Sequence, residues 1–341
     1  MKIAIISDAW HPQINGVVNS MQQTRKHLEQ FGHRVEMFTP LDFKTVPCPT
    51  YPSIRLAVMP GGKLSRLLQE YNPDTIHICT EGPLGMAARK WCKKRKLRFT
   101  TAYHTQFPQY VSLRAPLPLS WGYGMMRWFH TPSQAIMVPT LSVKRELEEQ
   151  GFGGKVKLWS RGVDTRLFHP QPGIDLGLKK PINMYVGRVA VEKNIGDFLD
   201  LKLPGSKLVI GDGPDLVRLK QLHPEVYFVG FKAGEELAAH IACADVFVFP
   251  SRTDTFGLVM LEALACGVPV AAYPVTGPID VITSNKVGCL DNDLQAATLA
   301  ALKLNPDDCR AYALKYTWEA ASRAFESHLV NCLPEDRSTP T

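Results

Sequence analysis

Two carboxylates, Asp254 and Glu262, stand eight positions apart and flank the run Thr255-Phe256-Gly257-Leu258. The run follows an expected strand at 245–250 and begins a helix, whose free N–H groups and positive dipole favour an anion such as a diphosphate. The Asp254 carboxylate can accept hydrogen bonds from sugar hydroxyls, and Glu262, about one turn further, faces the same way. The alternative is an acidic cap with a solvated glutamate, which the apolar residues around Glu262 disfavour.

A pair of cations, Arg188 and Lys193, lies at another expected turn from a strand to a helix, and Gly187 ends that strand. Two cations at such a turn can neutralise the two phosphates of a departing nucleotide diphosphate. Taken alone, such a pair is more often a surface accident, but its strand-end position matches that of Asp254. Gly211 begins a further glycine-rich strand end, which by itself is only a weak sign of a ligand.

The loop from Asp8 to Val17 also follows a strand and begins a helix, and Gly16 can bring its backbone close to a ligand. The loop lacks the Gly-x-Gly-x-x-Gly spacing, which argues against a nicotinamide cofactor. His104 ends another expected strand. A lone histidine is usually structural, but its place opposite the loops of Asp254 and Arg188 favours a functional role.

The triplet Asp291-Asn292-Asp293 matches an Asp-x-Asp pattern that binds metal ions in some enzymes. It lies in a turn before a helix, and capping of that helix by Asp293 explains it better. We therefore expect no catalytic metal and no cofactor.

Two series of strands alternating with helices must position these residues. The first series has expected strands at 2–8, 34–40, 54–59, 75–80, 98–104 and 135–139, with helices at 17–31, 84–95 and 142–150. The second has expected strands at 183–187, 207–211, 226–230, 245–250 and 269–273. Such alternation predicts parallel sheets that are covered by helices on both faces.

The predicted fold class is therefore α/β, with two Rossmann-like doubly wound domains facing a central cleft, where their strand ends meet. A length of 341 residues also suits two domains. A loop rich in Pro and Gly at 168–181 places the boundary, so residues 1–167 form an N-terminal domain and residues 168–316 a C-terminal one. Residues 334–341 are expected to be a disordered tail.

The composition limits where the chain works and what it binds. No apolar run reaches the roughly 18 to 20 residues that span a bilayer, and the apolar stretch at 3–6 is too short for a signal peptide, so we expect the chain to stay in the cytoplasm. The eight cysteines form no Cys-x-x-Cys pair, which indicates reduced thiols. The net charge is +12 over residues 1–170 and −5 over the remainder, so the first half should face something anionic. No nucleic-acid signature is present.

Two features of the first half predict an interfacial surface. One is a run of cations between residues 89 and 98, which includes Arg89, Lys90, Lys93 and Lys94. The other is an apolar helical face, within about 100° on a helical wheel, made by Trp121, Met125, Trp128 and Phe129. Cations would meet anionic head groups at about 1 kcal/mol each, and aromatic rings would enter the boundary. A solvated helix beside a core helix remains the alternative.

Motifs along nearly the whole chain resemble glycosyltransferase family 4, the retaining enzymes of the two-domain GT-B fold. They are Gly16, Tyr103-His104-Thr105, the run Ser160-Arg161-Gly162-Val163-Asp164-Thr165-Arg166-Leu167-Phe168, Val186-Gly187-Arg188 with Glu192-Lys193-Asn194, and Thr255-Phe256-Gly257-Leu258 with Leu261-Glu262-Ala263.

The resemblance implies a donor site in which Arg188 and Lys193 hold the diphosphate, Glu262 takes the ribose hydroxyls and His104 lies near the sugar. The family has Glu where this chain has Asp254, and the shorter side chain shifts the carboxylate. The implied catalytic residues are His104, Arg188, Lys193 and Asp254. The donor-binding residues are Gly16, Gly187, Arg188, Lys193, Gly211, Asp254, Thr255, Phe256, Gly257, Leu258 and Glu262. A final helix at 317–331 is expected to cross back onto the N-terminal domain.

The expected reaction moves a hexose or hexuronic acid, favouring UDP-glucose or UDP-glucuronate, to a membrane lipid such as diacylglycerol and forms an α-glycolipid. The motifs Thr80-Glu81-Gly82-Pro83-Leu84-Gly85 and 274–280 resemble bacterial enzymes that glycosylate diacylglycerol or add mannose from GDP-mannose, so a GDP-mannose-dependent mannosyltransferase is the alternative. A sugar-nucleotide epimerase of the same fold and a nucleotide-sugar sensor are weaker alternatives. The expected acceptor and membrane face, peripheral on the cytoplasmic side, comprises Trp10, Asn15, Tyr103, Arg89, Lys90, Lys93, Lys94, Trp121, Met125, Trp128 and Phe129.

Overall fold

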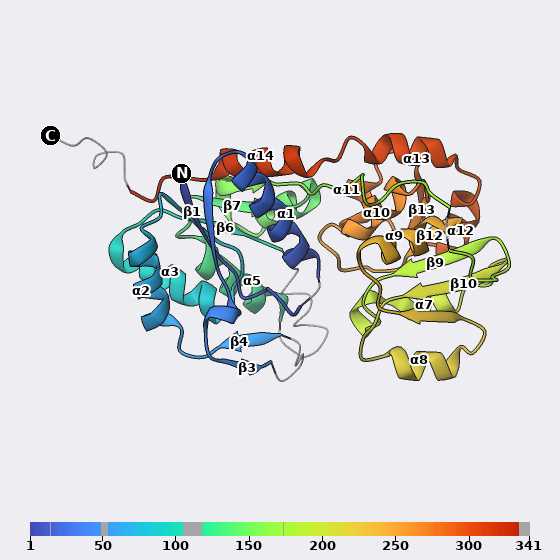
Figure 1. Cartoon of the computed structure of the whole chain (residues 1–341), viewed down its shortest axis with the longest axis horizontal. Helices are drawn as coiled ribbons and strands as arrows, with labels where there is room; N and C mark the ends of the chain where they lie inside the picture. Colours follow the sequence, from blue (N-terminus) through green and yellow to red (C-terminus); the bar gives the residue numbers. More distant parts are fainter. Residues whose placement is uncertain (14, 49–53, 105–117, 173, 334–341) are drawn as a thin grey trace. The chain divides into compact units, whose positions relative to one another are not determined.

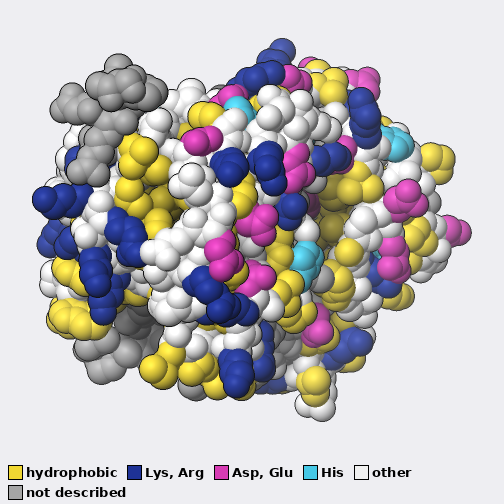
Figure 2. Space-filling model, turned by 60° about the vertical axis from the view of Figure 1, so that its left-hand side comes forward, with side chains coloured by type: hydrophobic (Ala, Val, Ile, Leu, Met, Phe, Trp, Pro, Cys, Tyr) yellow, Lys and Arg dark blue, Asp and Glu magenta, His cyan; other side chains and the backbone are white. Residues whose placement is uncertain are grey.

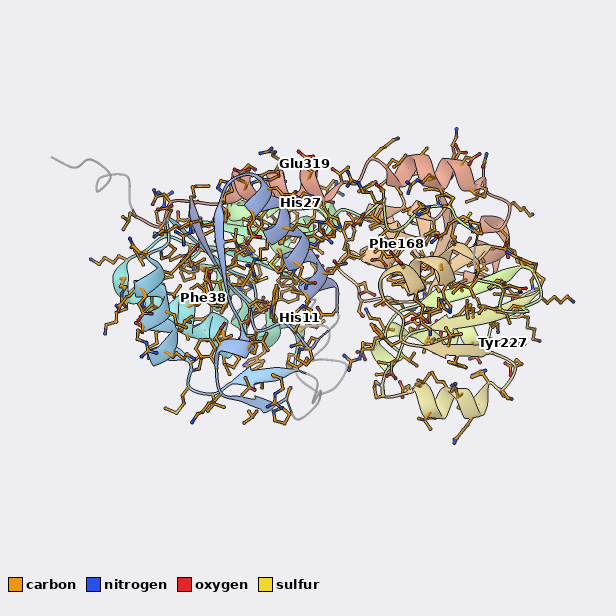
Figure 3. All side chains as sticks on the ribbon, viewed as in Figure 1. His11, His27, Phe38, Phe168, Tyr227 and Glu319 are labelled. Atoms are coloured by element: carbon orange, nitrogen blue, oxygen red, sulfur yellow. The ribbon has the colours of Figure 1, made fainter. Side chains whose placement is uncertain are left out.

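The computed structural model describes residues 1–333 except 14, 49–53, 105–117 and 173, so the expected tail at 334–341 lies outside the described residues. The chain divides into two compact units, Met1–Ser160 with Trp318–Thr341, and Arg161–Thr317. The boundary lies after Ser160, not after Leu167 as expected. The reason is that Val163 and Phe168 pack into the core of the second unit, where Phe168 is drawn in Figure 3.

The first unit contains a six-stranded sheet of order β2-β1-β5-β6-β7-β8, in which every pair is parallel. Its strands are β1 (Lys2–Ile6), β2 (Arg34–Phe38), β5 (Thr75–Ile78), β6 (Thr100–Ala102), β7 (Ala135–Val138) and β8 (Val156–Leu158). The strand expected at 54–59 is wrong as a member of this sheet. It forms β4 (Arg55–Ala57), which pairs antiparallel with β3 (Thr45–Pro47), because its half-exposed side chains do not suit a sheet covered on both faces.

Helices cover both faces of this sheet (Figure 1). They are α1 (Gly16–Gln30), α2 (Gly61–Tyr71), α3 (Pro83–Arg95), α5 (Leu119–His130), α6 (Leu141–Glu149) and α14 (Trp318–His328), with short 3-10 turns η1 (Pro40–Asp42) and η2 (Gly153–Lys155). The β1 side chains alternate between two apolar clusters. Ile3 and Ile5 share one with α1 and α14, and Ala4 and Ile6 share the other with α2 and α3.

The C-terminal helix α14 belongs to the first unit and lies beside α1 (Figure 1). Phe325 is fully buried against β1 and α1, and His33 Nε2 lies 2.7 Å from Glu326 Oε1. After the helix, the backbone of Cys332 donates to Asp74 O at 2.8 Å and accepts from Arg98 N at 2.8 Å. Backbone hydrogen bonds thus hold the end of the described chain to segments next to the first sheet.

The second unit repeats the plan with a parallel sheet of order β11-β10-β9-β12-β13-β14. Its strands are β9 (Ile182–Val186), β10 (Ser206–Ile210), β11 (Tyr227–Gly230), β12 (Val246–Phe249), β13 (Val270–Ala272) and β14 (Gly288–Leu290), of which β14 was not expected. Its helices are η3 (Val191–Lys193), α7 (Ile195–Leu199), α8 (Leu216–Leu222), α9 (Gly234–Ala242), α10 (Leu258–Ala265), α11 (Pro278–Val281), α12 (Leu294–Ala301) and α13 (Pro306–Ala313).

In each sheet the strand order reverses at one place, between β1 and β5 in the first unit and between β9 and β12 in the second. Doubly wound sheets bind ligands outside the carboxyl ends of the strands at such a reversal. The loops after these four strands are therefore the places to look for a site. No helix in the described part of the chain is long and apolar enough to cross a membrane.

Candidate functional site

In the second unit an ion pair joins the loops that follow β9 and β12. Lys193, at the end of η3, places Nζ 2.5 Å from Oδ1 of Asp254, and both side chains are mostly buried. The other oxygen, Asp254 Oδ2, is buried and receives no hydrogen bond from the residues that the structure describes. A buried carboxylate oxygen without a donor is costly, and its lone pairs could accept a hydrogen bond from a ligand hydroxyl or N–H group.

Glycines let the backbone segments around this ion pair approach one another closely. Gly211 follows β10, and a Cβ atom there would lie 1.8 Å from the carbonyl oxygen of Gly187, which follows β9. Gly257 takes the left-handed conformation with φ 82° and directly precedes α10. Arg188 is partly exposed in the loop after β9. The structure thus gathers Gly187, Arg188, Lys193, Gly211 and Asp254 at one end of one sheet.

The helix after Asp254 begins at Leu258, within the run expected to begin it. Phe256 is buried in the core of this unit, which removes its side chain from contact with a ligand, whereas Thr255 stays partly exposed. Glu262 is partly buried in α10, and its carboxylate receives no hydrogen bond from the described residues. Burial raises the pKa of Glu262 to about 7. A desolvated, unpaired carboxyl group is typical of a functional site.

The turn at Asp291 to Asp293 is a helix cap, as the sequence predicts. Oδ1 of Asp293 accepts from the backbone N–H groups of Gln295 and Ala296 at 3.0 and 3.1 Å, at the start of α12. Among the described residues, no group of three or more His, Cys, Asp and Glu side chains could hold a metal ion.

In the first unit, His104 lies just after β6, and its Nε2 is 3.2 Å from the buried thiol of Cys79, just after β5. Its ring meets that of Trp159 edge-on, with centroids 5.6 Å apart. The strand-end position expected for His104 is confirmed. Gly16 is exposed as the first residue of α1. The side chain of Asn15 caps this helix, because its Oδ1 accepts hydrogen bonds of 3.0 Å from the backbone N–H groups of Val17 and Val18.

The sequence reading missed the use of Asp8, which follows β1. Its carboxylate accepts hydrogen bonds from Leu84 N at 2.8 Å, Gly85 N at 3.2 Å and Thr80 Oγ1 at 2.9 Å. Burial raises the pKa of Asp8 above its usual value. The first turn of α3 therefore already has an anion, supplied by the chain itself.

Gly85→Ala is expected to destabilise the first unit by about 2 to 3 kcal/mol, because overpacking forces backbone shifts of that cost. A Cβ atom there would lie 1.8 Å from Thr80 O, in the turn that holds Asp8. Thermal unfolding measures the loss. The matched control is Gly62→Ala in α2, where a Cβ atom meets nothing within 4 Å. Alanine should raise the free energy of unfolding there by about 0.5 to 1 kcal/mol. Equal melting temperatures of the two variants would contradict this account.

For four residues of the expected acceptor and membrane face, the prediction of a surface position is wrong, because their side chains are buried. Tyr103 and Phe129 are at most 1% exposed, and Trp10 is 9% exposed against His11. Arg89 is buried, and its guanidinium donates to the carbonyl oxygens of Phe129 and Trp128 at the end of α5. Burial lowers the pKa of Arg89. It lies on the same side of α3 as buried Ala88 and Cys92, a side that the cation count could not distinguish from the exposed one.

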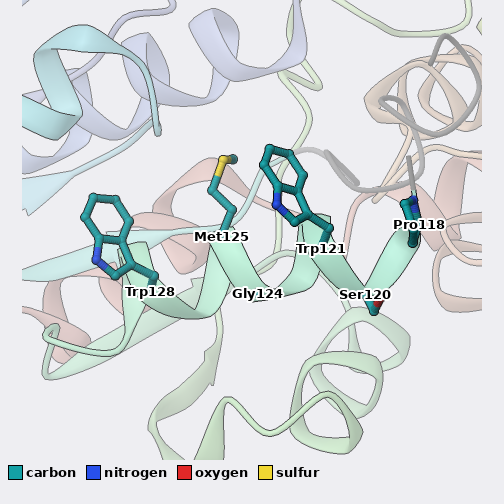
Figure 4. A pocket seen from close by; sticks show the side chains of 6 residues that line it. All are labelled: Pro118, Ser120, Trp121, Gly124, Met125 and Trp128. Atoms are coloured by element: carbon teal, nitrogen blue, oxygen red, sulfur yellow. The ribbon is translucent and has the colours of Figure 1, made fainter. Parts of the chain in front are cut away.

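The other members of that face are exposed as expected, except that Met125 is only partly exposed. Lys90, Lys93 and Lys94 are exposed on α3, and Trp121 and Trp128 keep 59% and 55% of their surface on α5. Together with Pro118, Ser120, Gly124 and Met125, the two indoles line a shallow apolar groove along α5 (Figure 4).

A buried series of side-chain hydrogen bonds, which the sequence did not indicate, passes through His130, the last residue of α5. Its Nε2 lies 3.1 Å from Glu81 Oε1 and its Nδ1 lies 2.9 Å from Thr101 Oγ1. Glu81 and His130 are 49 positions apart, so no local pattern could have revealed the pair.

Comparisons with known proteins identify the family and the fold. Residues 14–167 match the family described as Glycosyltransferase Family 4, and residues 180–305 match the one described as Glycosyl transferases group 1. A GDP-mannose-dependent alpha-mannosyltransferase of Mycobacterium tuberculosis is 29% identical over 316 residues, which cover 85% of this chain and 83% of that protein. An alpha-monoglucosyldiacylglycerol synthase of Streptococcus pneumoniae is 28% identical over 351 residues, covering 90% and 79%.

Among solved structures, sucrose-phosphate synthase from Thermosynechococcus elongatus has a similar fold, with a TM-score of 0.76 at 22% identity, covering 96% of this chain and 97% of that one. The two family matches leave only short stretches of the chain unmatched. With its motifs placed at the strand ends of two Rossmann-like sheets, the chain belongs to glycosyltransferase family 4 and has the GT-B fold.

Proposed function

We propose that the protein is a retaining, metal-independent glycosyltransferase that moves a hexose or hexuronic acid from a nucleotide diphosphate sugar to the hydroxyl group of a membrane lipid such as diacylglycerol. The observation that carries the donor side is the Lys193–Asp254 pair with its unsatisfied Asp254 Oδ2. The cation suits a phosphate, and the free oxygen suits a sugar hydroxyl. UDP-glucose or UDP-glucuronate is the proposed donor.

The proposed reaction breaks the bond between the sugar C1 and the diphosphate oxygen and forms a bond from C1 to the acceptor oxygen on the same face. Lys193 and Arg188 stabilise the charge that develops on the departing diphosphate, which takes the acceptor proton. Asp254 and Glu262 hold the sugar and ribose hydroxyls, and His104 lies near the sugar. Positioning and electrostatic stabilisation supply the rate enhancement without a covalent enzyme intermediate.

The lipid side of the proposal is supported by the outer face of α5 and the neighbouring α3. Trp121, Met125 and Trp128 project from the same side of α5 (Figure 4). The guanidinium of Arg89 lies 3.9 Å from the centre of the Trp128 ring and joins α3 to α5. Lys90, Lys93 and Lys94 are exposed on α3, and over the whole face of the molecule drawn in Figure 2, Lys and Arg side chains lie among hydrophobic ones. Indoles beside cations suit the boundary of an anionic membrane, with peripheral attachment.

Replacing Trp121 and Trp128 together with alanine is expected to weaken binding to vesicles at least tenfold, because each indole withdraws a large apolar area from water. Sedimentation with vesicles of phosphatidylglycerol and phosphatidylcholine at low salt measures this. The control is Trp91→Phe, since Trp91 is buried in α3 and its loss leaves the outer face intact. Undiminished binding of the double variant would remove α5 from the lipid-binding surface.

The function is tested by incubating the enzyme with UDP- and GDP-sugars and extracted lipids and identifying the product by mass. A glucosyl or glucuronosyl lipid is expected, with an α-anomeric signal by NMR and undiminished activity in EDTA. The mannosyltransferase relative gives specific support to a second candidate, and a mannosyl lipid made only from GDP-mannose would select it. An isomerised sugar nucleotide without any acceptor would instead show an epimerase.

A further inference from the structure

The series of hydrogen bonds through His130 is buried except at Glu81. His130 has no exposed surface, and Thr101 is also fully buried. Thr101 Oγ1 lies 3.2 Å from Ser133 Oγ, so the chain runs from Glu81 through three further side chains. Buried polar groups are costly unless they are bonded, and a fully bonded network fixes one geometry.

Aromatic rings hold the imidazole in place. The ring centroids of Phe129, Tyr103 and Phe152 lie 5.0, 6.2 and 6.2 Å from that of His130. Because these contacts leave the ring little freedom, the Nε2 atom presents a fixed partner to Glu81. The Glu81 side chain keeps 21% of its surface exposed, whereas His130 keeps none. The network therefore holds one carboxylate in a set position at the edge of solvent.

That position is the strand-order reversal of the first sheet. Glu81 lies in the loop after β5, between Thr80, which bonds Asp8, and Gly82, which precedes α3. Of the two carboxylates here, Asp8 is committed to the backbone of α3. Glu81 is the one whose side chain is both anchored and partly accessible, at the strand-order reversal where a doubly wound sheet takes its ligand.

We propose that Glu81 accepts a hydrogen bond from the acceptor hydroxyl and orients it for transfer, and that His130 and Thr101 act as positioning residues for that carboxylate. The inference rests on the proposed function. It assigns the first unit a specific acceptor-binding group. α5 links this group to the lipid surface, because Trp121, Met125 and Trp128 face outward on the helix that ends in His130.

Glu81→Gln tests this most directly, because the amide oxygen still accepts from His130 Nε2–H while the negative charge is lost. With UDP-glucose and dioleoylglycerol in phosphatidylglycerol vesicles, kcat/KM for the lipid is expected to fall about tenfold to a hundredfold, as for hydrogen bonds to charged groups. KM for the donor and donor hydrolysis without lipid should stay within about twofold. Glu70→Gln, on the exposed face of α2, is the matched control.

His130→Gln should lower kcat/KM for the lipid in the same direction, with the donor constants again unchanged. A merely structural role would lower the melting temperature and affect both substrates alike. If Glu81→Gln transfers sugar as well as the wild type does, the inference is overturned and the proposed function stands. If the wild type transfers sugar to no lipid hydroxyl from any donor tested, the proposed function fails and takes the inference with it.

Discussion

Lys193→Ala is expected to lower kcat about a hundredfold, close to 3 kcal/mol of barrier, because the cation would no longer stabilise charge on the departing diphosphate. The variant also leaves the mostly buried carboxylate of Asp254 without the partner that lies 2.5 Å from it. Loss of one member of a buried ion pair costs more than loss of both. Initial rates at saturating donor, with donor affinity measured by calorimetry, separate the catalytic loss from the binding loss.

The coupling between the two side chains gives a sharper test. Lys193→Ala combined with Asp254→Asn should lose less than the sum of the two single losses, because the double variant leaves no unpaired charge. Lys202→Ala is the control, since Lys202 is exposed after α7 in the same unit. A Lys193→Ala enzyme with kcat within threefold of the wild type would exclude the proposed role of this cation.

Glu262→Gln is expected to make the protein more stable and the enzyme worse. The carboxyl group titrates at about 7 in the folded protein, against an ordinary value of 4.5. The folded state therefore holds a proton that the unfolded chain has released, and stability falls as the pH rises from about 4.5 to 7. Glutamine removes this fall. Between pH 5 and pH 8, the free energy of unfolding of the variant should rise by about 2 kcal/mol relative to that of the wild type. This is less than the pKa difference alone would give, because Glu262 is partly exposed.

The same substitution should raise KM for the nucleotide sugar about tenfold at pH 8, because an amide accepts ribose hydroxyls more weakly than a carboxylate does. Denaturant unfolding at the two pH values and initial rates at pH 8 measure the opposing effects. An exposed carboxylate offers the control. Glu235→Gln, at the start of α9, should leave both the pH slope and KM unchanged. A Glu262→Gln protein with the stability slope of the wild type would show that the carboxyl group titrates normally.

Most of the architecture could be predicted from local pattern. Short apolar runs bounded by Gly or Pro predicted ten of the twelve strands in the two six-stranded sheets, because a strand buried on both faces needs continuous apolar residues. The two that escaped, β8 and β14, have three residues each and carry partly or fully exposed side chains. The strand expected at 54–59 was assigned to the wrong sheet for the complementary reason: three residues of strand propensity do not by themselves distinguish a strand of a central sheet from one of a small separate sheet.

The sequence by itself determined the residues that follow the strands, and parallel strands bring such residues to one edge wherever the sheet forms. Lys193 and Asp254 could thus be placed together before any contact was known. Tertiary structure decided which side chains remained free. Arg89 caps the end of α5, and Phe129 is buried in the core. Asp8 binds the backbone of α3, whereas Glu81 binds a histidine 49 positions away and stays partly exposed. Residue type and spacing fix what a group can do, but burial and hydrogen bonding come from elements distant in sequence, and only the folded chain sets them.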